Sequence, residues 1–89
     1  MTVKFELGER KHVRLIVSSC KGDDFEITLA SYELRRQYTD EVEDSGTCVI
    51  AEHAMDMMIA PQAAGKYWLH VTYHIADETL IDVVEVIVD

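Results

Sequence analysis

The fold of this chain is decided by one stretch of its sequence, Gly65-Lys66-Tyr67-Trp68-Leu69-His70-Val71-Thr72-Tyr73-His74-Ile75. A glycine opens the stretch, and every later odd-numbered position carries a large apolar side chain. Successive side chains of a β-strand point to opposite faces, so these apolar residues line one side of a sheet. The stretch is also rich in aromatic and β-branched residues, which strands favour. It therefore predicts a half-buried antiparallel strand.

Other segments of the chain alternate in the same manner and are separated by turn-forming residues such as those of Lys21-Gly22-Asp23-Asp24. The spacing of these turns, roughly eight to twelve residues, is typical of an all-β sandwich. We therefore predict that residues 1–89 form a single domain, an antiparallel β-sandwich of about seven strands. The expected strands lie at residues 3–7, 12–18, 30–35, 47–50, 55–59, 65–75 and 80–88, with a brief core contact at 25–27.

In three segments the sequence does not follow the simple alternation expected of strands. Ala, Glu and Met favour helix, so an α+β fold with a helix at residues 51–58 is the alternative, although Pro61 prevents a longer helix. The polar and acidic residues 37–46 predict an exposed hairpin. The pair Val83-Val84 breaks the alternation of the last strand, which predicts a bulge or cover on both faces.

Composition limits the classes of protein to which the chain can belong. A chain of 89 residues with 48% hydrophobic residues builds one modest core. No apolar run approaches the roughly 20 residues that span a bilayer, so we expect no membrane association. An acidic residue within residues 1–6 stands where a secretory signal has its basic and apolar regions, so we expect no signal peptide and a cytoplasmic protein.

The net charge of −9 is unevenly distributed, with +3 over residues 1–22 and −12 over residues 23–89. Because no basic stripe is available to displace counterions, we expect no binding to nucleic acid. The first interpretation of the acidic part is a solvated surface that keeps the protein soluble. An acidic patch that meets a basic partner, a head-to-tail contact between copies, and an acidic DNA mimic that inhibits a nucleic-acid-binding protein are the alternatives.

Cysteine and histidine patterns give no metal site. Cys20 and Cys48 are expected to be free thiols, because we expect no secretory signal, and they lack Cys-x-x-Cys spacing. His70 and His74 share one face of a strand but lie roughly 13 Å apart, too far to hold one ion. Nothing in the sequence indicates that His12 and His53 (the other two histidines) approach each other.

Catalytic and cofactor motifs are also missing from the sequence. Ser18-Ser19-Cys20 has no glycine elbow and no identifiable base, and the four glycines are isolated turn residues rather than a phosphate-binding loop. Carboxylates cluster in solvated runs such as residues 40–44, which favours surface over acid–base chemistry. We therefore expect no enzyme, no metal and no cofactor.

Trp68 is the candidate for an interaction surface. If Tyr67 and Leu69 face the core, Trp68 faces away from it, beside His70. Such a tryptophan either packs under a loop or a chain terminus or anchors a partner, because interfaces concentrate Trp, Tyr and Arg. Met58 is out of phase with the apolar side of its own strand and is predicted to join the same exposed surface. The predicted interaction surface is therefore Trp68, His70 and Met58.

The order of segments resembles a known group of proteins. Ala30-Ser31-Tyr32-Glu33-Leu34 precedes an acidic hairpin with Gly46, followed by Met57-Met58-Ile59-Ala60-Pro61, Gly65-Lys66-Tyr67-Trp68-Leu69 and a valine-rich last strand. Over residues 8–89 this resembles the small immunoglobulin-like proteins of phage and prophage tails and baseplates, such as the N-terminal domain of siphophage upper baseplate proteins. The pattern Gly-x-Tyr-x-Leu also has the form of the penultimate strand of immunoglobulin-like sandwiches.

The resemblance implies an immunoglobulin-like fold and a structural role, with no catalytic residues to transfer. Its partners would be tail or baseplate components or further copies of the chain, and the protein would pass from the host cytoplasm into the phage particle. The cysteines have no counterpart in that family. The rival interpretation is an accessory carbohydrate- or surface-binding sandwich that uses Trp68, Tyr73 or His70 as a stacking platform.

Overall fold

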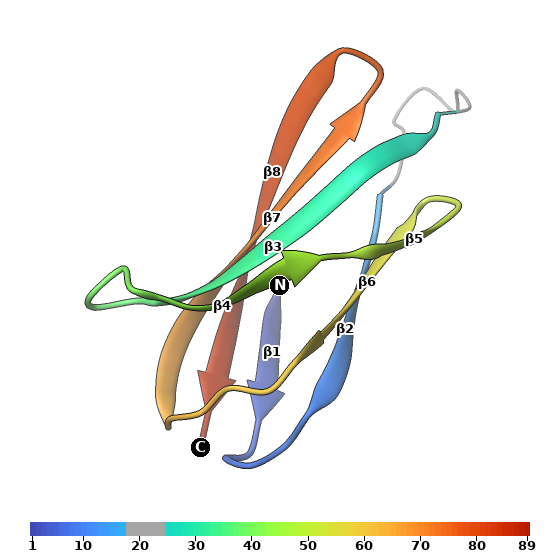
Figure 1. Cartoon of the computed structure of the whole chain (residues 1–89). Helices are drawn as coiled ribbons and strands as arrows, with labels where there is room; N and C mark the ends of the chain where they lie inside the picture. The colour runs from blue at the N-terminus through green and yellow to red at the C-terminus, as the bar shows by residue number, and fades with distance from the viewer. Residues whose placement is uncertain (18–24) are drawn as a thin grey trace.

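The computed structural model describes residues 1–17 and 25–89, which form two packed layers of β-strands (Figure 1). One layer is a five-stranded sheet in the order β1-β8-β7-β3-β4, and the other is a three-stranded sheet in the order β2-β6-β5. The predicted all-β sandwich is confirmed. The strands are β1 (Thr2–Phe5), β2 (Lys11–Ile16), β3 (Ile27–Arg36), β4 (Val42–Thr47), β5 (Val49–Ala51), β6 (Ala54–Ile59), β7 (Gly65–Ile75) and β8 (Glu78–Val88).

The strand order is that of an immunoglobulin-like sandwich. In such folds the second, fourth and fifth strands of the core form one sheet and the third, sixth and seventh form the other, often extended by an additional edge strand. Here β2, β6 and β5 form the first sheet, and β3, β7 and β8 form the second, extended by β4 and β1. Among the described strands, β1 and β8 run parallel and every other pair is antiparallel.

The decisive stretch is β7, which lies in the middle of the five-stranded sheet with β8 on one side and β3 on the other. Its burial alternates as predicted. Tyr67, Leu69, Val71 and Tyr73 are buried, whereas Ile75 at the end of the strand is partly exposed. The other sheet presents Met55, Met57 and Ile59 of β6 and Val13 and Leu15 of β2 to the same core.

The alternative helix at residues 51–58 is not formed. Val49–Ala51 and Ala54–Ile59 pair as an antiparallel hairpin through a turn in which Glu52 has a positive φ of 55°. Ala, Glu and Met favour helix locally, but a helix would not place Met55, Met57 and Ile59 together on one side against β7. Burial of these three side chains outweighs the weak local preference.

The acidic segment 37–46 is more ordered than the sequence indicates. After a turn, Val42–Thr47 forms β4 and pairs with β3, with a register shift at Leu34 and Arg35. The addition of β4 accounts for eight strands in the described residues instead of about seven. Gly46 lies within this strand and not in a turn. A Cβ at this position would come within 3.1 Å of the Tyr32 ring, so the close packing of that ring favours glycine here.

The prediction of a bulge or of cover on both faces at Val83-Val84 is wrong. The register between β7 and β8 runs without a shift from Gly65↔Val88 to Ile75↔Glu78. Val84 points into the core and Val83 points outward, where 47% of its surface is exposed. The pair breaks the sequence pattern because an apolar residue occupies an outward position.

Replacing Leu69 with alanine tests the inward side of β7. We expect Leu69→Ala to lower the free energy of unfolding by about 2–5 kcal/mol, because it leaves a cavity in a fully buried site. Thr72→Ala, on the outward side of the same strand, should cost no more than about 1 kcal/mol. Urea unfolding followed by circular dichroism measures both, and equal losses would contradict the assigned faces.

Candidate functional site

The outward side of the five-stranded sheet carries the strongest candidate for an interaction surface. Trp68 of β7 lies between Arg35 of β3 and Glu85 of β8 in the strand register. His70, the next outward residue of β7, lies between Glu33 and Val83. We call this surface the Trp68 face. It comprises the outward side chains of β3, β7 and β8: Leu29, Ser31, Glu33, Arg35, Trp68, His70, Thr72, His74, Thr79, Ile81, Val83 and Glu85.

Four large apolar side chains of the Trp68 face are exposed to solvent. The exposed fractions are 59% for Leu29, 37% for Trp68, 61% for Ile81 and 47% for Val83. The register brings Trp68, Val83 and Ile81 close together, because Val83 lies opposite His70 and Ile81 lies opposite Thr72. Leu29 lies further away on β3, opposite His74. The Trp68 side chain is thus not fully covered by any loop or chain terminus within residues 1–17 and 25–89. Neighbouring exposed apolar side chains of this kind mark interaction surfaces.

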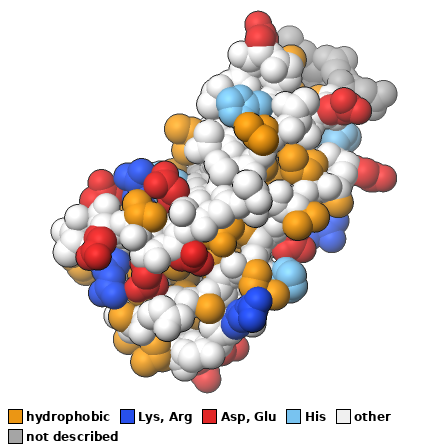
Figure 2. All heavy atoms as spheres, in the orientation of Figure 1, with side chains coloured by type: hydrophobic (Ala, Val, Ile, Leu, Met, Phe, Trp, Pro, Cys, Tyr) orange, Lys and Arg blue, Asp and Glu red, His pale blue; other side chains and the backbone are white. Residues whose placement is uncertain are grey.

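Ion pairs border the Trp68 face at the end of the sheet that carries the β3–β4 turn. The Arg35 guanidinium lies 3.1 Å from a Glu33 carboxylate oxygen and 3.4 Å from Asp40. The hydrogen bond to Glu33 and the Glu33 charge raise the pKa of Arg35, whose positive charge lies beside Trp68. Figure 2 shows acidic and basic side chains gathered at this end of the molecule. The surface thus combines an apolar centre with a charged border.

The structure brings two of the three predicted surface residues together. Trp68 and His70 share the Trp68 face, but Met58 lies on β6, opposite His12, and faces outward from the three-stranded sheet. The prediction that Met58 joins the surface of Trp68 therefore fails, because the two strands belong to different layers.

Tyr73 is also separated from Trp68. Its ring is buried in the core, and its hydroxyl donates a hydrogen bond of 3.1 Å to the Asp82 carboxylate. A stacking platform that combines Trp68 with Tyr73 is therefore not formed, which removes much of the support for a carbohydrate-binding sandwich.

The histidines lie apart from one another and have different neighbours. His70 and His74 are outward residues of β7, separated by Thr72. His12 Nδ1 lies 2.8 Å from Asp56, whereas His53 stacks on the Phe25 ring at 4.0 Å, at the other end of β6. Over residues 1–17 and 25–89, no group of three or more histidine, cysteine or acidic residues is placed to hold a metal ion. No helix in the same residues is long and apolar enough to cross a membrane.

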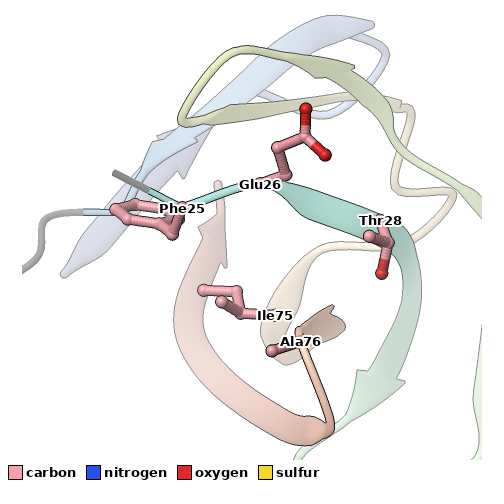
Figure 3. A pocket seen from close by; sticks show the side chains of 5 residues that line it. All are labelled: Phe25, Glu26, Thr28, Ile75 and Ala76. Carbon is pink, nitrogen blue, oxygen red and sulfur yellow. The ribbon is translucent and has the colours of Figure 1, made fainter. Parts of the chain in front are cut away.

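A hollow of about 510 Å³ opens at the end of the sandwich where β3 begins and the β7–β8 turn lies (Figure 3). Phe25 and Ile75 provide apolar walls, and the Glu26 carboxylate points away from Ile75 and Ala76. The hydroxyl of Thr28 is directed to the His74 carbonyl oxygen at 3.4 Å. The polar groups that line this hollow do not converge on a common point, so it does not present an acid–base pair.

A half-buried carboxylate that sequence reasoning missed lies under the corner between β6 and β7. Glu43 of β4 accepts hydrogen bonds of 3.0 Å from the Tyr67 hydroxyl, 3.0 Å from Arg36 and 3.1 Å from the Gln62 backbone N–H. The Tyr67 hydroxyl also lies 3.2 Å from the Ala63 carbonyl oxygen, the arrangement of a tyrosine corner in immunoglobulin-like folds. The sequence signal is Gly-x-Tyr at the start of β7, but nothing local links it to Glu43.

Cys48 is a free thiol between β4 and β5, whereas Cys20 lies outside the described residues. Burial, with a smaller contribution from the nearby Asp56 charge, raises the pKa of the Cys48 thiol to about 11. Its thiolate, the reactive form, is therefore scarce at neutral pH. Cys48 behaves as a packing residue.

Comparison with known proteins yields a fold and no family. No family model matches the chain, and a search of curated proteins found no relative. A similar solved structure is that of an engineered protein, a target of the Northeast Structural Genomics Consortium determined at 1.98 Å. It superposes with a TM-score of 0.74 and 19% sequence identity over 98% of this chain, which spans 18% of that protein's length. At this identity the likeness shows the fold alone.

Removing the Tyr67 hydroxyl tests the corner. We expect Tyr67→Phe to lower the free energy of unfolding by about 1–3 kcal/mol, because it leaves the Glu43 carboxylate with one hydrogen bond fewer in a half-buried site. Tyr38→Phe, which removes the hydroxyl of an exposed tyrosine, is the matched control and should unfold like the parent chain. A Tyr67→Phe variant as stable as the control would show that the corner contributes nothing.

The reactivity of Cys48 tests its burial. In a Cys20→Ser background, alkylation by iodoacetamide at pH 8 should be about 100-fold slower in the folded protein than in denaturant, because the thiol pKa rises from 9.0 to about 11 on folding. The rate should keep rising with pH up to about 11. Since the folded-state pKa is the higher one, this group's contribution to stability is complete below pH 9 and is lost as the pH rises towards 11. Equal rates in folded and unfolded protein would contradict the assignment.

Proposed function

We propose that this chain is a non-enzymatic, immunoglobulin-like interaction module that binds a protein partner through the Trp68 face and serves as a structural component of a phage or prophage tail or baseplate. The observation that carries the proposal is the exposed apolar group of Trp68, Ile81 and Val83 on one side of the five-stranded sheet.

The composition of the Trp68 face supports protein binding. Trp and Arg are the residues that most often dominate binding energy at protein interfaces, and here Trp68 and Arg35 are direct neighbours across β7 and β3. The apolar side chains lie on β3, β7 and β8, the three inner strands of the five-stranded sheet, so little conformational entropy is lost when a partner covers them. The ion pairs around Arg35 form a polar border of the kind that surrounds interface centres.

The assignment to a tail or baseplate rests on the resemblance of the segment order described above. A rigid domain in which no set of catalytic groups converges among residues 1–17 and 25–89 suits a structural role, and the net charge of −9 disfavours binding to nucleic acid. In this proposal the chain is made in the cytoplasm of the host and then enters the particle through contacts with other tail proteins. A carbohydrate-binding role has less support, because Tyr73, a member of the predicted stacking platform, is buried in the core.

Trp68→Ala tests the proposed function. Particles are purified from cells that produce a tagged chain, and the amount of chain per particle is measured by quantitative immunoblotting. We expect incorporation of the variant to fall by about tenfold or more, as for the loss of a central interface tryptophan. Thermal unfolding should remain cooperative, because Trp68 lies outside the core.

Tyr38→Ala is the matched control, because Tyr38 is an aromatic residue of the β3–β4 turn with 88% of its surface exposed. It should be incorporated like the parent chain. Particles that contain no parent chain, or that take up Trp68→Ala as well as Tyr38→Ala, would contradict the proposal.

A further inference from the structure

The outer edge of β8 is covered over only part of its length. β1 pairs with it from Thr2↔Glu85 to Phe5↔Val88, and the Met1 carbonyl accepts a hydrogen bond from the Glu85 N–H. Residues 78–84 of β8 pair with β7 on one side. On the other side, no strand of the described residues pairs with them, and Figure 1 shows the β7–β8 hairpin extending past the start of β1.

The polar groups of this free edge can be assigned. The N–H groups of Glu85 and Asp89 point towards β1, where they donate to Met1 and Phe5. Backbone groups of a strand alternate in direction from one residue to the next. The N–H and C=O groups of Thr79, Ile81 and Val83 therefore point away from β7 to the open side.

A hollow lies beside the end of this edge that is nearest to β1. This hollow of about 460 Å³ is lined by Met1, Arg14, Ile16, Asp82 and Val83, among others. Met1 and Ile16 are strongly exposed, so an apolar wall continues from the edge of β8 to β2. Unpaired edges with exposed apolar side chains are templates for pairing with another strand.

We propose that a second copy of this chain pairs with this edge, β8 against β8 in antiparallel orientation, with Ile81 opposite the Ile81 of the other copy. Residues 78–84 are centred on Ile81, so this two-fold register uses the whole free edge. Thr79, Ile81 and Val83 of each copy then meet Val83, Ile81 and Thr79 of the other. All three are hydrogen-bonded pairs, which gives about six backbone hydrogen bonds.

Charge selects this register over its neighbours. With Ile81 at the centre, Asp82 lies opposite Leu80 and Glu78 lies opposite Val84, so no two carboxylates within residues 78–84 face each other. The one acidic pair, Asp77 with Glu85, lies at the two ends of the contact, where Asp77 belongs to the β7–β8 turn. A centre at Asp82 would place its two copies directly opposite, and a centre at Leu80 would pair Asp82 with Glu78; like charges so placed destabilise a sheet. A centre at Val83 would require the Glu85 N–H, which is already bonded to Met1. Of the registers centred on residues 80–83, only the one centred on Ile81 avoids both opposed carboxylates within residues 78–84 and use of the Glu85 N–H.

The dimer would extend the proposed function without depending on it. Because the two-fold axis of an antiparallel strand pair stands perpendicular to the sheet, the Trp68 faces of both copies lie on the same side of one continuous sheet. Two linked binding surfaces raise the effective affinity for a repeating partner such as a ring. The charge of −9 on each copy opposes association, so added salt should strengthen the dimer.

A pair of substitutions at Val83 tests the edge. Val83→Ala and Val83→Pro both remove the β-branched side chain, but only proline removes the N–H that points to the open side. Sedimentation equilibrium at low and high salt should find a dimer for the parent chain and for Val83→Ala. For Val83→Pro, the dissociation constant should rise by about tenfold or more. A parent chain that is monomeric under all conditions would overturn the proposal, as would equal association of a folded Val83→Pro variant.

A register test keeps the proposal falsifiable if Val83→Pro does not fold. In a Cys20→Ser, Cys48→Ser background, Ile81→Cys should form a disulfide-linked dimer on mild oxidation, because opposed residues of a hydrogen-bonded pair lie within disulfide reach. Val83→Cys should not, since its two copies would lie roughly 13 Å apart. Cross-linking of Val83→Cys as readily as Ile81→Cys would overturn the register. Trp68→Ala should dimerise like the parent chain, which separates failure of the dimer from failure of the Trp68 face.

Discussion

The rest of the structure depends on the strict alternation of side chains along β7. This strand has paired neighbours on both sides, and its inward residues touch the core from one end of the sandwich to the other. Because the side-chain period of a strand is two residues, a slip by one position would bury Trp68 and His70 and expose Leu69 and Val71. The same constraint that builds the core therefore fixes which residues form the Trp68 face.

The corner before β7 holds this arrangement in register. Tyr67 buries its ring in the core while its hydroxyl contacts Ala63 and Glu43, so one side chain joins the incoming loop, β7 and β4. Arg36 adds a charge-assisted bond to the same carboxylate and lies over the Tyr67 ring at 5.8 Å. A half-buried carboxylate is costly unless it is well hydrogen-bonded, and here several donors compensate it. The corner thus links the edge strand β4 to the centre of the sheet.

The sequence was sufficient for those features that local patterns determine. Alternation identified β7 and most other strands, and with them the inward Leu69 and the outward Trp68. It did not identify which strands become neighbours. Met58 and Trp68 are both out of phase with buried residues, yet they lie on different sheets, which only the topology decides.

Contacts between distant segments also explain the other differences between the sequence-based predictions and the structure. Glu43 lies in an acidic run that resembles solvated surface, and its partners Arg36, Gln62 and Tyr67 come from other segments. Gly46 resembles a turn residue because its packing partner, the Tyr32 ring, lies on a neighbouring strand. The helical preference of residues 51–58 is a local signal that burial against β7 overrides. In each case a contact between distant segments determines what the residue does.

The central claim is that β7 separates a core side from a side that binds a protein partner. Oxidative footprinting of Trp68 followed by mass spectrometry tests it most directly, with the free chain and the assembled particle compared under identical conditions and Tyr38 as internal reference. Our account predicts strong labelling of Trp68 in the free chain and protection in the particle, while Tyr38 is labelled in both. Labelling of Trp68 to the same extent in both states would contradict it.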